Sequence, residues 1–299
     1  MIQTRPFEFM VKYTPQREWI QRRGILLWLA FFFIELGAGM FFVSSFFNNL
    51  GGLVIGWLIC AVLGGGTHLL YLGHPLRFWR IFISSGWKTS WISRGLYFVA
   101  FFLILGVVHM GLLFWVTPAT PLLVITDIFA FLVIIYGGFA MNYVNGISLW
   151  NTALLPILYV VAGIWGGAEL MLATALATGA TGLGLAVEEW IRILLIGFII
   201  LLAVYLISVR YGSLAGGVSV REIVFGRWAP LLWVVVVALG IVLPSAVVIL
   251  SFIAGLEATP AALLYIAIFC GLIGDLATRY LILRCGYYHP IVPSHVYSY

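Results

Sequence analysis

Eight long apolar runs, separated by short polar connections, account for most of this chain. The runs cover residues 25–47, 52–72, 93–116, 122–142, 153–178, 190–211, 229–254 and 261–283. Each has about the 20 residues that an α-helix needs to cross a hydrocarbon core of about 30 Å. In lipid, the backbone polar groups must find their hydrogen-bond partners within the helix itself. The pattern therefore predicts an all-α, polytopic membrane protein, a bundle of eight transmembrane helices that forms one integral membrane domain over residues 1–299.

The composition supports this interpretation and excludes several functional classes. Hydrophobic residues make up 64% of the chain and charged residues 8%, whereas soluble domains are about 25% charged. Cys60, Cys270 and Cys285 are far apart and form no CxxC or Cys/His pattern, so we expect no zinc or iron–sulfur site in this chain. The sequence has no Walker A loop, so we expect no ATP-driven transport.

The cationic residues lie almost entirely on one side of the predicted membrane. Of the 15 Lys and Arg residues, only Arg192 lies on the side opposite the N-terminal arm and the C-terminal tail. Cytoplasmic loops are the ones that retain cations in membrane proteins. We therefore predict that both termini are cytoplasmic, and that the net charge of +5 reflects membrane topology rather than nucleic-acid binding. The connections on the opposite side are predicted at 48–51, 117–121, 179–189 and 255–260.

Four ionisable side chains within the runs are candidates for a proton relay. Glu35 and Glu169 lie near mid-membrane with no cation in their own helix, so each is expected to be protonated or hydrogen-bonded. Asp275 and Arg279 are spaced i, i+4 and share a helix face. Ionisable groups are costly in lipid, which makes all four functional candidates. The structural alternative is that the Asp275–Arg279 pair anchors the last helix and that the glutamates join helices.

A group of polar and aromatic side chains gathers near the cationic side of the second and fourth runs. The group comprises His68, Tyr71, His74, Arg77, Tyr136 and Asn142. Donors and acceptors at shallow depth, between apolar walls, suit a small amphiphilic ring with two carbonyl or hydroxyl oxygens. A quinone fits this description, and its reduction needs protons from neighbouring side chains. A lipid-headgroup site would show a similar set of residues.

The histidines of the runs do not predict haem. A bis-His haem needs two imidazoles at one depth on facing helices. Counted from the ends of their runs, His68 lies about 6 Å below one surface and His109 about 10 Å below the opposite one, at about 1.5 Å per residue. These two side chains are therefore not expected to share an iron.

Four stretches of the chain occur together, and in this order, in a known family. They are Tyr71–Trp79 (YLGHPLRFW), Ser90–Arg94 (SWISR), the segment from Tyr136 through Asn151 to Pro156, and the ending from Gly274 to Pro290. Together they resemble the NrfD-like family, the membrane subunits of polysulfide reductase and, more distantly, of dimethyl sulfoxide reductase. The resemblance covers essentially all eight runs.

The resemblance implies a haem-free anchor subunit that binds a quinone, either menaquinone or ubiquinone. It also implies an iron–sulfur subunit and a molybdopterin catalytic subunit as partners, which would hold all the iron–sulfur clusters and the molybdopterin. The chain would then be a quinone-reactive subunit of an oxidoreductase, not catalytic alone, in the inner membrane of a bacterium or archaeon.

The resemblance also assigns roles to single positions. The quinone-contacting tyrosine of the family falls on Tyr136. The chain departs from the family where Tyr71 replaces a position that is often acidic or histidine, and where Gly95 replaces an acidic one. His68, His74 and Glu35 are the candidates to supply the missing protonic groups.

The charge pattern and the resemblance together predict an orientation. In this family the quinone pocket lies near the face where the iron–sulfur subunit docks, at the turn between the second and third runs. In this chain that face is cationic and is predicted to be cytoplasmic. Our hypothesis is therefore a cytoplasm-facing complex of a sulfite-oxidising type that reduces quinone.

Two other functional classes remain open from the residues alone. One is a proton-coupled secondary transporter, in which Gly64-Gly65-Gly66 and Pro244 interrupt helices and Glu35 and Glu169 carry protons. The other is a structural or assembly protein of the membrane.

Overall fold

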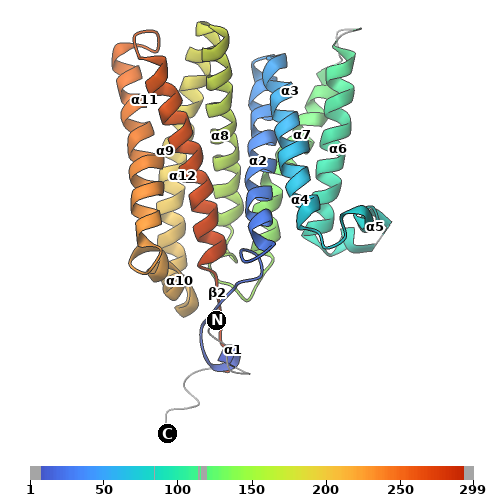
Figure 1. The fold of residues 1–299 in the computed structure, drawn as a ribbon, viewed down its shortest axis with the longest axis vertical. Helices are drawn as coiled ribbons and strands as arrows, with labels where there is room; N and C mark the ends of the chain where they lie inside the picture. The colour runs from blue at the N-terminus through green and yellow to red at the C-terminus, as the bar shows by residue number, and fades with distance from the viewer. Residues whose placement is uncertain (1–7, 84, 114, 116–119, 293–299) are drawn as a thin grey trace.

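The prediction of an all-α membrane protein is confirmed. The computed structural model describes residues 8–83, 85–113, 115 and 120–292. The structure is 80% helical, and among the described residues eight helices are long and apolar enough to cross a membrane (Figure 1). These spans are α2 (Gly24–Phe46), α3–η1–α4 (Leu50–Leu58, Ile59–Gly65, Gly66–Tyr71), α6 (Trp91–Leu112), α7 (Thr120–Asn142), α8 (Leu154–Thr178), α9 (Thr181–Gly212), η4–α11 (Leu231–Val242, Leu243–Ala254) and α12 (Ala261–Arg284).

Short elements lie outside the spans. They are α1 (Glu8–Val11), β1 (Thr14–Pro15), η2 (Pro75–Arg77), α5 (Arg80–Ile83), η3 (Ser85–Lys88), α10 (Leu214–Val224) and β2 (Tyr287–Tyr288).

One predicted connection is wrong. Residues 179–189 were expected to form a loop, but α9 begins at Thr181. The chain reverses within two residues because Gly179 adopts a left-handed conformation (φ 68°) that ends α8. The acidic residues of this segment kept it out of the apolar run, although Glu188 is buried within the helix.

Two spans contain a π-helical stretch. These stretches are η1 in the second span and η4 in the seventh. The Gly64-Gly65-Gly66 sequence, expected to interrupt the second helix, continues it through the π-helical turn. Pro244, expected to interrupt the seventh, lies within a continuous span, at the junction of its π-helical and α-helical stretches. Because π-turns often accompany functional sites, η1 marks a candidate position for one in the second span.

The centre of the bundle is formed by α2 and α8, which pack with their backbones in contact (Figure 1). A Cβ atom at Gly39 would collide with the backbone of Gly163, and one at Gly167 would collide with the backbone of Gly39 and Met40. Small residues permit such close approach between membrane helices, where dispersion contacts provide much of the stabilisation.

The two ends of the described chain meet at one end of the bundle, below α2 and α12 (Figure 1). Strand β1 pairs antiparallel with β2, with Thr14 opposite Tyr288. The backbone N–H of Gln16 donates to Gly286 O at 2.8 Å, and its buried side chain donates to Leu283 O. We call this end of the bundle the cationic face; it carries β1, β2, α10 and the connections 72–90 and 143–153.

Candidate functional site

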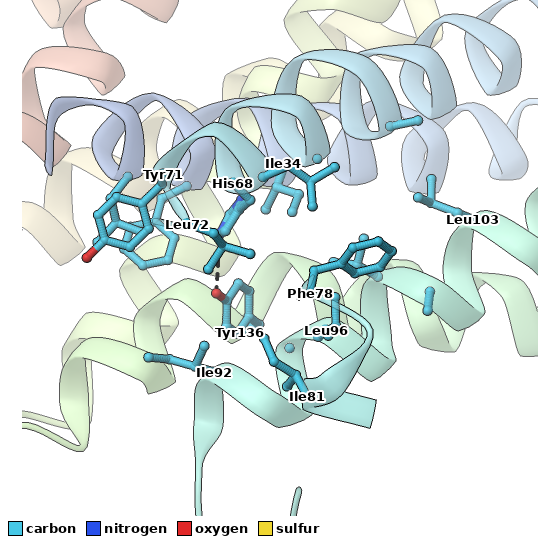
Figure 2. A pocket seen from close by; sticks show the side chains of 18 of the residues that line it. Ile34, His68, Tyr71, Leu72, Phe78, Ile81, Ile92, Leu96, Leu103 and Tyr136 are labelled. Atoms are coloured by element: carbon cyan, nitrogen blue, oxygen red, sulfur yellow. Dashed lines mark hydrogen bonds between the residues drawn. The ribbon is translucent and has the colours of Figure 1, made fainter. Parts of the chain in front are cut away.

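A partly enclosed cavity of about 410 Å³ lies near the cationic face. It is bounded by α2, the second span, α6 and α7, and the segment around α5 covers one side of it (Figure 2). Its walls are largely aliphatic and aromatic. The volume falls within the range of small-molecule sites, about 300–1,000 Å³.

Two polar side chains in this cavity, a tyrosine and a histidine from different helices, contact each other. Tyr136 of α7 and His68 of α4 lie with Oη and Nε2 3.3 Å apart (Figure 2). His68 Nδ1 is 3.1 Å from Gly64 O. A carbonyl oxygen can only accept, so Nδ1 carries the proton of a neutral ring and Nε2 accepts from the Tyr136 hydroxyl. The pair thus provides one hydrogen-bond donor and one acceptor. A ligand oxygen could replace His68 as the partner of the Tyr136 hydroxyl.

Local packing holds these two rings in place. Phe31 of α2 makes edge-to-face contacts with both His68 and Tyr136, with ring centroids 5.9 Å apart in each case. On the opposite side, Gly95 of α6 lies directly against the Tyr136 ring, so that a Cβ atom there would collide with it. Gly95 therefore provides the space that the tyrosine ring occupies.

This contact predicts that an alanine substitution has very different effects at two glycines that line the cavity. Gly95→Ala should displace the Tyr136 ring and destabilise the bundle, because overpacking costs about 1–3 kcal/mol. Gly65→Ala is the matched control, since a Cβ there meets only Cys60 O at 3.6 Å. The melting temperatures of both variants in detergent measure the difference. Equal melting temperatures would show that the Tyr136 ring moves aside without cost.

Of the other four residues of the predicted polar group, one lines the cavity and three do not. Tyr71 lines the cavity together with His68 and Tyr136. His74 and Arg77 lie exposed in the following connection and do not line it. Asn142 Nδ2 donates to Thr152 O at 2.6 Å, which closes the turn between α7 and α8.

Several lining residues could not be found from sequence. Trp19, Phe31, Phe78 and Phe82 contribute aromatic surface. Such residues are ordinary in spans and at membrane interfaces, so their type carries no signal. The only hint was the i, i+4 spacing of Phe78 and Phe82 in a connection that should otherwise be polar.

A buried ionic cluster lies behind the cavity. Arg279 of α12 donates through Nε to Asp275 Oδ2 at 3.0 Å and through Nη1 to Glu35 Oε2. Its guanidinium group also lies 4.5 Å from the ring centroid of Tyr159. The i, i+4 pair expected from sequence is therefore present, and Glu35 on α2 joins it from another helix. Arginine suits this position because its planar group can donate to two carboxylates at once.

The cluster approaches the cavity through Glu35. A Cβ atom on Gly137, the residue after Tyr136, would collide with Glu35 Oε1. This oxygen is buried and has no hydrogen-bond partner among the described residues. Phe31, which contacts the tyrosine–histidine pair, lies one turn before Glu35 on α2. One carboxylate oxygen thus points toward the helix that carries Tyr136.

The same acidic groups extend away from the cavity along α12. Glu169 of α8 packs against Gly271, one turn before Asp275. Its Oε2 is buried and also lacks a partner within the described part of the chain. The positions 271, 275 and 279 are spaced by four residues and share one face of α12. The four candidates for a proton relay are therefore brought into one row.

Fold and site define a polytopic α-helical membrane protein with a shallow apolar cavity and a buried ionic cluster. The family model described as "Polysulphide reductase, NrfD" matches residues 22–291, so the chain belongs to this family. The family is the membrane anchor of molybdopterin oxidoreductase-type complexes, interacts with quinone, and typically partners with iron–sulfur and molybdopterin subunits. Comparison with curated proteins gives no match.

Proposed function

We propose that this chain binds the head group of a quinone, menaquinone or ubiquinone, in the cavity that contains His68 and Tyr136. The observation that carries the proposal is a cavity with apolar walls and a donor–acceptor pair 3.3 Å apart within it. Aromatic and aliphatic walls suit an apolar ring, and Tyr136 Oη and His68 Nε2 suit its oxygens. A bound quinone would accept two electrons and two protons. Tyr71 also lines the cavity and adds a second hydroxyl that could contact the ring.

The chain's own residues would manage the protons of this reaction. In quinone reduction, Tyr136 would donate the proton of Oη to one quinone oxygen, and His68 would take up a proton at Nε2 from the cationic face and pass it on; their hydrogen bond keeps the two groups together. Glu35 lies behind Tyr136, and its Oε1, which has no hydrogen-bond partner in the described part of the chain, could pass a proton to that site when protonated. We propose that Glu35, Arg279, Asp275 and Glu169 form a proton relay along α12, with Arg279 holding the carboxylates in position.

The electrons would arrive at the cationic face. We propose that an iron–sulfur subunit docks there, connects this chain to a molybdopterin catalytic subunit, and brings a cluster close to the cavity. The cavity lies near that face, which keeps the transfer distance short. The excess of basic residues supplies a surface for an acidic partner.

Co-purification tests this assignment. The chain isolated in mild detergent is expected to carry iron–sulfur absorbance and molybdenum in fixed ratio to itself. A preparation without either, but with substrate uptake by the lone chain in liposomes, would instead support a secondary transporter.

The cation distribution further supports an orientation in which the cationic face is cytoplasmic, as in a complex that oxidises sulfite and reduces quinone. A cysteine introduced at Thr89, which is exposed in the connection before α6, should react in intact cells with a membrane-permeant maleimide but not with an impermeant one. Permeabilised cells provide the control, because both reagents should then react. Reaction with the impermeant reagent in intact cells would reverse the orientation and remove the sulfite-oxidising hypothesis.

A further inference from the structure

The connection between α4 and α6 has two unlike faces. We consider residues 75–83 and 86–88, called here the in-plane segment. Its inner face carries Phe78, Ile81 and Phe82, which line the cavity (Figure 2). Its outer face carries Leu76 and Ile83, which are 89% and 75% exposed. Large aliphatic side chains exposed to this degree are unfavourable in water, so the outer face needs an apolar neighbour.

The connection that contains this segment, with the first turn of α6, is strongly basic. Residues 73–94 contain Arg77, Arg80, Lys88 and Arg94 and no Asp or Glu. Arg80 lies 5.7 Å from the ring centroid of Trp79, and Lys88 lies 5.8 Å from that of Trp87. Both tryptophans are about half exposed. Aliphatic, tryptophan and basic side chains on one surface are typical of an element that lies at the boundary between headgroups and acyl chains.

The segment is attached to α6 through backbone carbonyl groups. Arg94 donates through Nε to Trp87 O at 3.0 Å and through Nη2 to Lys88 O at 2.6 Å. Tyr97 Oη donates to Phe82 O at 2.7 Å. Because these bonds fix the backbone, the outward side chains are presented as a surface rather than left to fold back on the cavity.

The segment also lies where a membrane surface would be. Figure 1 shows α5 at the rim of the bundle beside the first turn of α6, displaced sideways from β2 and α10. It is therefore level with the ends of the spans but outside the central part of the cationic face.

We propose that the in-plane segment rests on the surface of a leaflet that contains anionic phospholipid. Leu76 and Ile83 would enter the acyl-chain boundary, and Arg77 and Arg80 would contact phosphate groups. Anionic lipid is favoured over an acidic protein surface because the exposed aliphatic side chains require hydrocarbon as well as negative charge. Since Phe78, Ile81 and Phe82 form the other face, the lipid surface would also hold the cover of the cavity in place. The proposal concerns the outer face and does not depend on quinone binding.

Spin labels in the assembled complex test the location. In a Cys270→Ser background, in which Cys60 and Cys285 are buried, nitroxides are attached to Leu76→Cys and to Ile83→Cys. Ala258→Cys, exposed in the connection before α12, is the aqueous control. In bilayers with phosphatidylglycerol, labels 76 and 83 should collide more with oxygen than with a water-soluble nickel complex, and label 258 the reverse. Preference for nickel would place the segment in water, and loss of both collisions would show a covering protein; either result would overturn the proposal.

Charge removal tests the requirement for anionic lipid. Each arginine near an anionic surface changes the docking equilibrium about fivefold, so Arg77→Gln/Arg80→Gln should shift label 83 toward water about 25-fold in phosphatidylglycerol bilayers. The matched control is Arg221→Gln/Arg227→Gln, which removes the same charge from exposed positions in and after α10 and should leave label 83 unchanged. An equal shift with both pairs, or none with the first pair, would contradict a local lipid contact.

Discussion

Replacing Tyr136 with phenylalanine is expected to lower the quinone turnover of the assembled complex about a hundredfold. A side chain that transfers a proton in the transition state contributes about 10²–10⁴ in rate, and the lower value applies where His68 remains able to supply a proton. The substitution removes the hydroxyl that contacts His68 Nε2 and keeps the ring that packs between Phe31 and Gly95. The loss should therefore appear in kcat more than in the stability of the chain.

Steady-state assays with a soluble quinone analogue measure this effect. Tyr143→Phe is the matched control, because Tyr143 lies just after α7 and is 62% exposed. It should leave turnover unchanged, and both variants should still co-purify with the iron–sulfur subunit. If Tyr136→Phe retains full turnover, Tyr136 does not contact the reacting oxygens, and the assignment of this cavity loses its main support.

Arg279→Gln is expected to destabilise the bundle by about 3–5 kcal/mol. Arg279 is 2% exposed and is the cation that contacts both Glu35 and Asp275. Its removal leaves two carboxyl groups buried without compensation, and a buried polar group without a partner is costly in a low-dielectric interior. The variant should unfold at a clearly lower temperature in detergent and should accumulate poorly in membranes.

Two further variants separate charge from packing. Arg284→Gln removes a half-buried arginine from the last turn of the same helix and should change the melting temperature little. The triple variant Glu35→Gln/Asp275→Asn/Arg279→Gln has no ionised group in the cluster and should recover much of the stability, since neutral replacement of a buried ion cluster is often tolerated. Failure of the triple variant to recover would show that shape, rather than charge compensation, makes Arg279 necessary.

If the triple variant folds but its complex turns quinone over slowly, the cluster has a role beyond stability. A merely structural cluster would give a stable complex with normal turnover. The pH dependence of turnover distinguishes slow proton delivery from loss of binding, because binding loss alone changes KM without moving the pH profile.

The spans were predictable from the chain because the membrane imposes one simple requirement on it. A segment that crosses hydrocarbon must be about 20 residues long, apolar and helical, and each of these features can be read locally. The same holds for the i, i+4 geometry of Asp275 and Arg279, which depends on one helix alone. The start of α9 was missed because Glu188 is buried by neighbouring helices, which a local hydropathy pattern does not register.

Pairings between helices could not be predicted in this way. Glu35 of α2 and Arg279 of α12 are 244 positions apart in the chain, and no spacing rule connects them. His68 and Tyr136 were both expected in one polar group, but their contact depends on Gly64, Gly95 and Phe31, which set the height and angle of the two rings. His74, Arg77 and Asn142 have equally suitable chemistry and do not line the cavity, because the chain turns away before His74 and the Asn142 amide closes a turn.

Residue order alone thus established the number of spans, their all-helical character and the side on which the cations lie, since lipid acts on each segment separately. The cavity, the partner of Glu35 and the two-faced cover over the site arose only when the helices packed. Apolar side chains look alike along the chain, and it is the fit between helix backbones at positions such as Gly39 and Gly167 that selects which of them face each other.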